Sequence, residues 1–186
     1  MKKVMSTKVL SYCALLAALS VVLARLIVPM PNAFTRFSIE AVPIFLAGML
    51  FGPVAGGMVG FTADLVGCLF SGFGYNPIFC VPPILYGVAA GLFRREIAGK
   101  RTLLWLIVAF LFPAVFGSVL YQSTALSYIY YYDPAVAGSF RQGMLYFLST
   151  RSVQFAVTAV IDVAILSLML KARIFHRLGV WPPVSK

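Results

Sequence analysis

Charged residues are scarce in this sequence. They make up 11% of its 186 residues, whereas a soluble domain has about 25%. Hydrophobic residues make up 61%, and the mean hydropathy is +0.96. This composition excludes an ordinary soluble domain and a disordered chain, and it indicates a membrane protein. The length suits a single domain.

Acidic residues, cysteine and histidine are scarcer still. Five Asp and Glu stand against 15 Lys and Arg, which gives a net charge of +10. The three cysteines, Cys13, Cys68 and Cys80, lie far apart within apolar runs and lack metal-ligand spacing. The single histidine, His176, lies in a basic tail with no carboxylate nearby. We therefore expect no metal site and no cofactor.

Sequence motifs of catalysis are also missing. The chain has no G-x-x-x-x-G-K-[ST] phosphate loop, no H-E-x-x-H and no G-x-S-x-G. We therefore expect that it is not an enzyme and hydrolyses no nucleotide. It also lacks an internal repeat long enough for two halves that rock against each other. A chain of this size is expected to need partners to drive transport.

Long apolar runs predict an all-α, polytopic membrane protein. The run 39–70 would make a helix of about 48 Å, longer than a bilayer core of about 30 Å. Gly52-Pro53 divides it, because proline cannot continue a helix interior. We predict one integral membrane domain over 1–186, with six transmembrane helices at approximately 8–28, 39–51, 54–70, 78–93, 103–121 and 145–170. Pro113 predicts a kink in the fifth, and 128–143 predicts the longest polar loop, with tyrosines at the membrane interface.

The basic residues predict the orientation of these helices. With six spans, eleven of them fall on one side, which the positive-inside rule assigns to the cytoplasm together with both termini. They are Lys2, Lys3, Lys8, Arg94, Arg95, Lys100, Arg101, Lys171, Arg173, Arg177 and Lys186. This distribution explains the net charge without nucleic acid as a partner. The four that remain, Arg25, Arg36, Arg141 and Arg151, fall at or near the outer side.

Small residues recur at a spacing of four. Gly48, Gly52, Gly56 and Gly60 form one series, and Gly87 and Gly91 form a second. This spacing lets helix backbones approach closely, so we expect most of these glycines to pack helices of the same chain. Ala14 and Ala18 form a similar pair in the first span. For this pair, internal packing and docking to the helix of another protein are both open.

Ionisable residues inside the apolar runs predict either internal ion pairs or a binding site. Arg36 and Glu40 would share a helix face if the second helix began early. Asp64 and Asp162 suit internal ion pairs or polar tethers. Arginine holds carboxylates through two parallel hydrogen bonds, and aromatic residues accompany the outer arginines. An outer pocket of this kind suits a flat, anionic solute.

The sequence resembles a family of membrane transport proteins, and the resemblance covers nearly the whole chain. Its most specific segment begins at Phe34-Thr-Arg-Phe-Ser-Ile-Glu and continues through Pro43–Pro53 and Asp64 to Gly74-Tyr-Asn-Pro-Ile-Phe and Leu85-Tyr-Gly. These residues resemble the substrate-binding S component of energy-coupling factor (ECF) vitamin transporters, most closely the folate-specific members. The Pro43–Pro53 motif is shared by several S components, whereas the segments around Arg36 and Gly74 favour folate.

The resemblance implies a six-helix fold with an outward pocket that binds its vitamin with high affinity. It also implies partners: a transmembrane coupling protein, which would contact Ala14 and Ala18, and two cytoplasmic ATPases. Pro29 and Pro31 would belong to a gate loop. The S component would topple within the bilayer of the cell membrane while the ATPases supply energy.

We predict a folate-binding S component. The pterin would stack on aromatic residues and form hydrogen bonds with Asn76 and Gln122, while Arg36, with Arg151 or Arg25, would meet carboxylates or polar ring atoms. The aromatic candidates include Phe34, Tyr75 and Tyr86. Two alternatives remain open: an S component for another small molecule, such as thiamine, pantothenate or a queuosine precursor, and a non-transporting membrane scaffold.

Overall fold

The computed structural model describes residues 6–25, 28–29, 36–37, 39–71, 75–133, 136, 138–172 and 175. Apart from two strands of two residues each, its regular elements are helices, which confirms the predicted all-α fold. In chain order they are α1 (Thr7–Arg25), β1 (Val28–Pro29), β2 (Arg36–Phe37), α2 (Ala41–Phe51), α3 (Pro53–Ser71), η1 (Pro77–Cys80), α4 (Val81–Leu92), α5 (Arg94–Ile97), α6 (Thr102–Pro113), η2 (Ala114–Tyr121), α7 (Gln122–Tyr130) and α8 (Ser139–Lys171).

Each predicted span coincides with an apolar helical stretch. Three stretches in the described residues are long and apolar enough to cross a membrane: Thr7–Ala24, Thr102–Tyr130 and Ser139–Lys171. Three shorter ones are Ala41–Phe51, Pro53–Leu69 and Pro77–Leu92. The number of membrane crossings and the side of the termini stay predictions.

The helices that contain the last two predicted spans extend beyond them. The fifth continues past residue 121 through α7 to Tyr130, and the last begins at Ser139, six residues before the predicted span. Half of the predicted loop 128–143, at its two ends, is therefore helical. No glycine or proline interrupts 118–133, so its polar residues do not end the helix. Gly138, at φ +82°, adopts the left-handed conformation immediately before α8.

Prolines and a glycine divide the apolar runs as predicted. Gly52 ends α2 at φ +104°, a backbone conformation that favours glycine, and Pro53 begins α3. At the next division, α4 starts at Val81 with proline in its first turn, where a missing N–H group costs little. After Pro113 the chain continues as the π-helical segment η2, whose wider turns leave the bundle intact.

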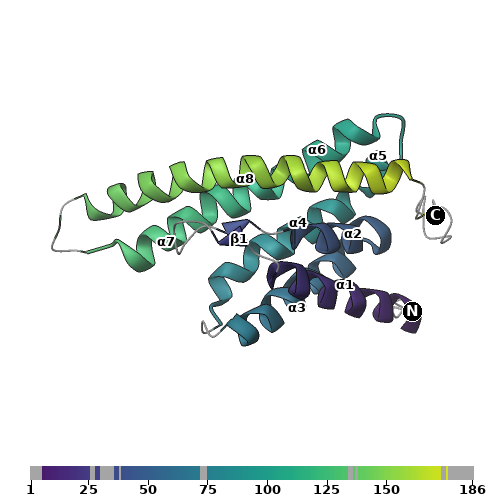
Figure 1. Ribbon diagram of the computed structural model, residues 1–186, viewed down its shortest axis with the longest axis horizontal. Coiled ribbons are helices and arrows are strands. Elements are labelled where there is room, and N and C mark those ends of the chain that lie inside the picture. The colour runs from purple at the N-terminus through teal and green to yellow at the C-terminus, as the bar shows by residue number, and fades with distance from the viewer. Residues whose placement is uncertain are drawn as a thin grey trace.

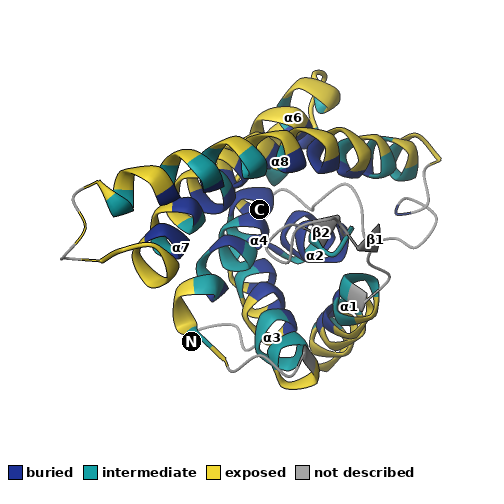
Figure 2. Ribbon diagram, turned by 60° about the vertical axis from the view of Figure 1, so that its left-hand side comes forward, coloured by how far each residue is buried: buried dark blue, intermediate teal, exposed yellow. Residues whose placement is uncertain are grey.

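The helices form two layers, which Figures 1 and 2 show from two sides. One layer contains α6, α7 and the long α8, and the other contains α1, α3 and α4 around α2. Residues 42–49 of α2 are all buried, and this helix contacts α1, α3, α4 and α8. Three rings join the layers: Phe110 of α6 lies with its ring centroid 5.5 Å from that of Phe45 and 4.9 Å from that of Tyr86.

The predicted glycine packing is confirmed within α2, α3 and α4. A Cβ atom on Gly48 or Gly56 would overlap the carbonyl oxygen of Gly87, and one on Gly60 would overlap that of Pro83. Gly91 lies equally close to Pro53. Gly52 differs from the rest of its series, because its positive φ serves the turn between α2 and α3.

One end of the molecule is basic. This end, on the right in Figure 1, contains α5, the first residues of α1 and α6, and the last residues of α8. These elements and the connection between α5 and α6 carry the described members of the predicted cytoplasmic group, Lys8, Arg94, Arg95, Lys100, Arg101 and Lys171. The arrangement agrees with the common side that the sequence predicted for them.

The predicted helical pair of Arg36 and Glu40 does not form. Helix α2 begins only at Ala41, and Arg36 lies in strand β2. β1 and β2 are antiparallel, with Pro29 opposite Arg36 and Val28 opposite Phe37. The β conformation removes the helical spacing that would have placed Arg36 one turn before Glu40. The sequence did not predict this ribbon, because each strand has only two residues and prolines lie in and near the first.

Candidate functional site

Arg151 of α8 forms the best-defined polar contact between the two long helical segments. Its Nη1 donates to Oε1 of Gln122 at 2.6 Å and to the carbonyl oxygen of Ser118 at 3.4 Å. Its guanidinium carbon lies 5.9 Å from the ring centroid of Phe155. Arg151 is half-buried, so the contacts hold a cation between η2, α7 and α8. Arg151 and Gln122, both predicted site residues, are therefore neighbours.

A polar seam continues from Arg151 along the inner face of α8. Gln154, Thr158 and Asp162 are buried with exposed fractions of 6%, 7% and 2%. Their spacing of three or four residues places all four side chains on one helix face. On the facing segments, Ser118 and Ser123 are buried as well. We call these residues, Ser118, Gln122, Ser123, Arg151, Gln154, Thr158 and Asp162, the polar seam.

Sequence reasoning missed Gln154, Thr158, Ser118 and Ser123 as members of this group. The signal was present in α8, where polar residues recur at 151, 154, 158 and 162 in an apolar helix. Arg151 and Asp162 were considered singly, as ionisable residues, and Gln154 and Thr158 were not considered. The four were therefore not recognised as one helical face. For Ser118 and Ser123, burial depends on contacts with α8, to which the local sequence gives no clue.

The β1–β2 ribbon and η1 bring two other predicted segments toward the seam. β2 contacts α8, and η1 contacts α7. The backbone of Arg36 therefore lies beside the helix that carries Arg151. Tyr75 and Asn76 immediately precede η1 and lie beside the helix that begins with Gln122. Segments far apart in the sequence thus contact the two helices, α7 and α8, that carry most of the seam.

Asn76 and Tyr75 have defined local roles. The Asn76 side chain accepts a hydrogen bond from the backbone N–H of Ile78 at 3.1 Å and caps η1. The amide N–H groups of Asn76 can still donate to a ligand. A hydrogen bond with the Cys80 thiol raises the pKa of the Tyr75 hydroxyl above its ordinary value. Tyr75 is therefore a neutral phenol at physiological pH.

The remaining predicted ligand residues are placed differently. Tyr86 is 5% exposed and lies against Phe110, and Ser118 is near enough to its hydroxyl group to affect it. It therefore supports the seam from the buried core. Arg25 is the last residue of α1, and the backbone of Pro29 lies in β1. Phe34 and Pro31 lie outside the described residues.

Ala14 and Ala18 lie on the outer side of α1. Both are exposed, whereas Cys13, Ala17 and Ser20 make the buried face of the same helix. The neighbouring Leu15 is 67% exposed and Val22 is 56% exposed. The alanine pair is therefore not used for packing among the described helices, and it belongs to an apolar surface that no other described element covers.

The geometry suits binding rather than catalysis. The seam supplies a fixed cation, amide groups and hydroxyl groups, which recognise anionic and polar parts of a solute. Arg151 precedes Lys171 at the basic end by twenty residues of one helix, or about 30 Å, which matches the thickness of the hydrocarbon core.

Comparisons with known proteins identify the class. Residues 4–172 match the family described as ECF-type riboflavin transporter, S component. The folate transporter FolT of Clostridium novyi (strain NT) is 32% identical over 107 residues, which are 56% of this chain and 60% of that protein. The match thus spans less than two thirds of that relative.

Solved structures agree with this class. The crystal structure of FolT bound with folic acid matches with a TM-score of 0.62 and 26% identity, covering 85% of this chain and 94% of that one. The S component of a bacterial ECF transporter matches at 0.58 and 20% identity, covering 91% and 99%. The biotin S component of an ECF-type transporter matches at 0.55 and 18% identity, covering 88% and 95%. The last two show the fold alone.

The fold and these matches define the membrane-embedded, substrate-binding subunit of a transporter, and not an enzyme family. The chain belongs to the family of ECF-type riboflavin transporter S components. The resemblance inferred from the sequence is thereby confirmed at the level of the S component.

Proposed function

We propose that the protein binds folate as the S component of an ECF vitamin transporter in the cell membrane. The observation that carries the proposal is the contact of Arg151 with Gln122, on the helix that β2, the strand of Arg36, also contacts. It provides a fixed cation next to a second arginine segment, as a dicarboxylate solute requires. The FolT relative and the FolT structure with folic acid support the choice of vitamin.

In this proposal the polar seam and the segments around it divide the ligand between them. Gln122 and Asn76 form hydrogen bonds with the pterin, and Phe34, Tyr75 and Tyr86 provide aromatic surface near it. Arg36, with Arg151 or Arg25, pairs with carboxylates or polar ring atoms. The loop that contains Pro29 and Pro31 gates the pocket.

Riboflavin is the second candidate, because the matching family is described by that vitamin. Its ring system is also flat, but it carries no carboxylate. The two candidates therefore differ in their need for arginine. Removing a charge-assisted hydrogen bond costs about 1.5–3 kcal/mol, so it weakens folate binding about 10- to 150-fold and riboflavin binding far less.

Ligand titration separates the candidates. Purified protein is titrated with folic acid and with riboflavin while intrinsic fluorescence is recorded, and native mass spectrometry identifies any retained molecule. We expect folate to bind at micromolar concentration or below, and Arg36→Ala to weaken it by the factor above. Arg141→Ala is the matched control, since Arg141 is exposed near the start of α8, away from the seam. Failure to bind folate would reject the vitamin assignment, and binding of riboflavin alone would establish the second candidate.

The single domain of six transmembrane helices, with both termini cytoplasmic, is part of this proposal. So are a transmembrane coupling protein, two cytoplasmic ATPases and toppling of the whole S component in the bilayer. The basic end of the helices supports the orientation, and the exposed alanines of α1 support a docked helix. Cysteine labelling at residues 100 and 141, from each side of sealed vesicles, tests the orientation: label reaching both sites from the same side would contradict it.

A further inference from the structure

Two hollows meet at the start of α6, at the basic end of the molecule. The first, of about 290 Å³, lies between α5, α6 and α8, and its lining includes Thr102, Leu103, Leu106 and Lys171. The second, of about 640 Å³, opens on the outer face of α6 and is lined mainly by Lys100, Arg101, Leu104, Ile107 and Val108. Thr102 and Leu103 line both, so the two hollows are adjacent.

The outer hollow combines a basic rim with an apolar floor. Leu103 and Leu104 are 54% and 51% exposed, and Ile107 and Val108 continue the same face one turn further along α6. Lys100 and Arg101 precede this face directly and are exposed. An apolar surface that runs along a helix from two cations fits an acyl chain attached to an anionic group.

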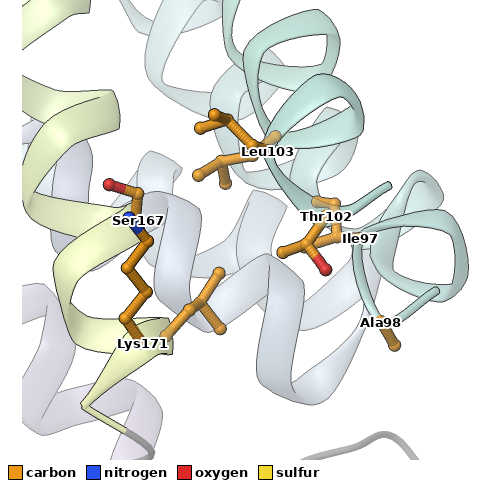
Figure 3. Close-up of a pocket in the computed structure, with 8 residues that line it drawn as sticks. Ile97, Ala98, Thr102, Leu103, Ser167 and Lys171 are labelled. Atoms are coloured by element: carbon orange, nitrogen blue, oxygen red, sulfur yellow. The ribbon is translucent and has the colours of Figure 1, made fainter. Parts of the chain in front are cut away.

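A third cation faces the junction from the other side. Lys171 lies at the end of α8, and Figure 3 shows its side chain extending along that helix toward Ser167, across the pocket from Leu103 and Thr102. Among the described residues at this end, the only carboxylate is that of Glu96 in α5. Its single charge leaves Lys100, Arg101 and Lys171 in excess.

We propose that this surface binds one anionic phospholipid. The phosphate lies over the junction of the two hollows between Lys100 and Arg101 on one side and Lys171 on the other, and one acyl chain lies along Leu103, Leu104, Ile107 and Val108. Charge complementarity selects the headgroup, and the membrane setting of the family supplies the lipid. The site lies at the end of α8, twenty residues or about 30 Å along the helix from Arg151, so it is separate from the proposed vitamin site and does not depend on which vitamin binds there.

Native mass spectrometry of the full chain in detergent tests the site, because a detergent micelle removes the general attraction of a charged bilayer. We expect dioleoyl phosphatidylglycerol to bind at least tenfold more tightly than dioleoyl phosphatidylcholine. At about fivefold per basic residue, Lys100→Gln with Arg101→Gln should weaken phosphatidylglycerol binding about 25-fold. The matched control combines Lys8→Gln with Arg141→Gln, which removes the same charge at exposed positions outside the hollows and should change binding less than twofold.

Two further probes separate the possible sources of the signal. Inorganic phosphate and dihexanoyl phosphatidylglycerol should bind at least tenfold more weakly than the dioleoyl lipid, because neither fills the apolar face. Lys171→Gln alone should weaken binding about fivefold, and it keeps the proposal testable if the double variant is unstable. Equal binding of phosphatidylcholine, of phosphate alone or of the short-chain lipid would overturn the proposal. So would an equal loss in the control, or unchanged lipid binding together with a lost contact to the coupling protein, which would assign the surface to protein docking.

Discussion

Helices α2, α3 and α4 pack backbone against backbone, whereas α6, η2, α7 and α8 pack through side chains. In the first region Gly48 and Gly56 leave no space for a Cβ atom beside Gly87. In the second, Arg151 reaches Gln122 and Ser118, and Met144 accepts contacts from the hydroxyl groups of Thr124 and Ser127 at 3.8 and 4.0 Å. All residues of the polar seam lie in the second region, on η2, α7 and α8.

This difference indicates which region of the protein tolerates substitutions. A glycine contact has one geometry, because any added atom overlaps backbone. A long polar side chain can form hydrogen bonds with several neighbours, so a contact between two such side chains can be preserved when another polar residue replaces one of the two. We infer that the first region fixes the fold and that the second, with the β1–β2 ribbon, provides the specificity.

The strongest test of the comparison replaces a packed glycine by a branched residue. Gly56→Val would force α3 away from α4 at the carbonyl group of Gly87, and we expect a loss of more than about 3 kcal/mol of stability. The readout is thermal unfolding in detergent together with the yield of monodisperse protein. Gly67→Val in the same helix is the control, since a Cβ there has no neighbour within 4 Å, and it should change stability by about 1 kcal/mol or less. Equal losses in both variants would refute the packing argument.

A smaller effect is expected from the seam. Arg151→Met keeps the length of the side chain but removes its hydrogen bonds to Gln122 and Ser118, and we expect a loss of about 1–3 kcal/mol. Folate binding should weaken in the same variant if the proposed function holds. A thermodynamic cycle with Gln122→Leu measures the coupling of the pair. Additive effects of the two substitutions would show that the contact contributes nothing of its own.

The sulfur contacts provide a weaker test of side-chain packing. Met144→Leu preserves volume and removes only a weak hydrogen-bond acceptor for Thr124 and Ser127, whose hydroxyl groups also bond to backbone carbonyls. We expect a loss below about 1 kcal/mol in thermal unfolding. A loss comparable to that of Gly56→Val would mean that the second region is as intolerant as the first.

The smallest effect on stability is expected at the small residues of α1. Ala14 and Ala18 are exposed, so Ala14→Leu or Ala18→Leu should change stability by no more than about 0.5 kcal/mol. Co-purification with the coupling protein should nevertheless fall sharply, because a larger side chain separates the helices. Leu19→Phe is the control, because it enlarges an exposed side chain on another face of the same helix. Unchanged co-purification would remove the alanine pair from the proposed interface.

Much of the fold was predictable because the local signals were strong. The Gly52-Pro53 division, the glycine series and the apolar runs all predicted features that the structure contains. The ends of α7 and α8 were not, because polar residues such as Ser127 tolerate a helix when no glycine or proline stops it. Among site residues, Arg151 and Gln122 were chosen singly for their chemistry, and their contact was not foreseen.

The sequence by itself determined the membrane class, the approximate helices, the basic end and the membership of the S-component family. The first three follow from hydropathy, turn residues and charge, which act over a few neighbouring positions, whereas the family follows from the resemblance of segments such as Pro43–Pro53 to known S components. Only the tertiary structure decided that Arg151 meets Gln122 across 29 residues, that Gln154 and Thr158 share its face, and that β2 lies against α8. Such meetings depend on how each helix is rotated and packed against its neighbours, and an apolar helix with several equally apolar faces does not specify that rotation in its own sequence.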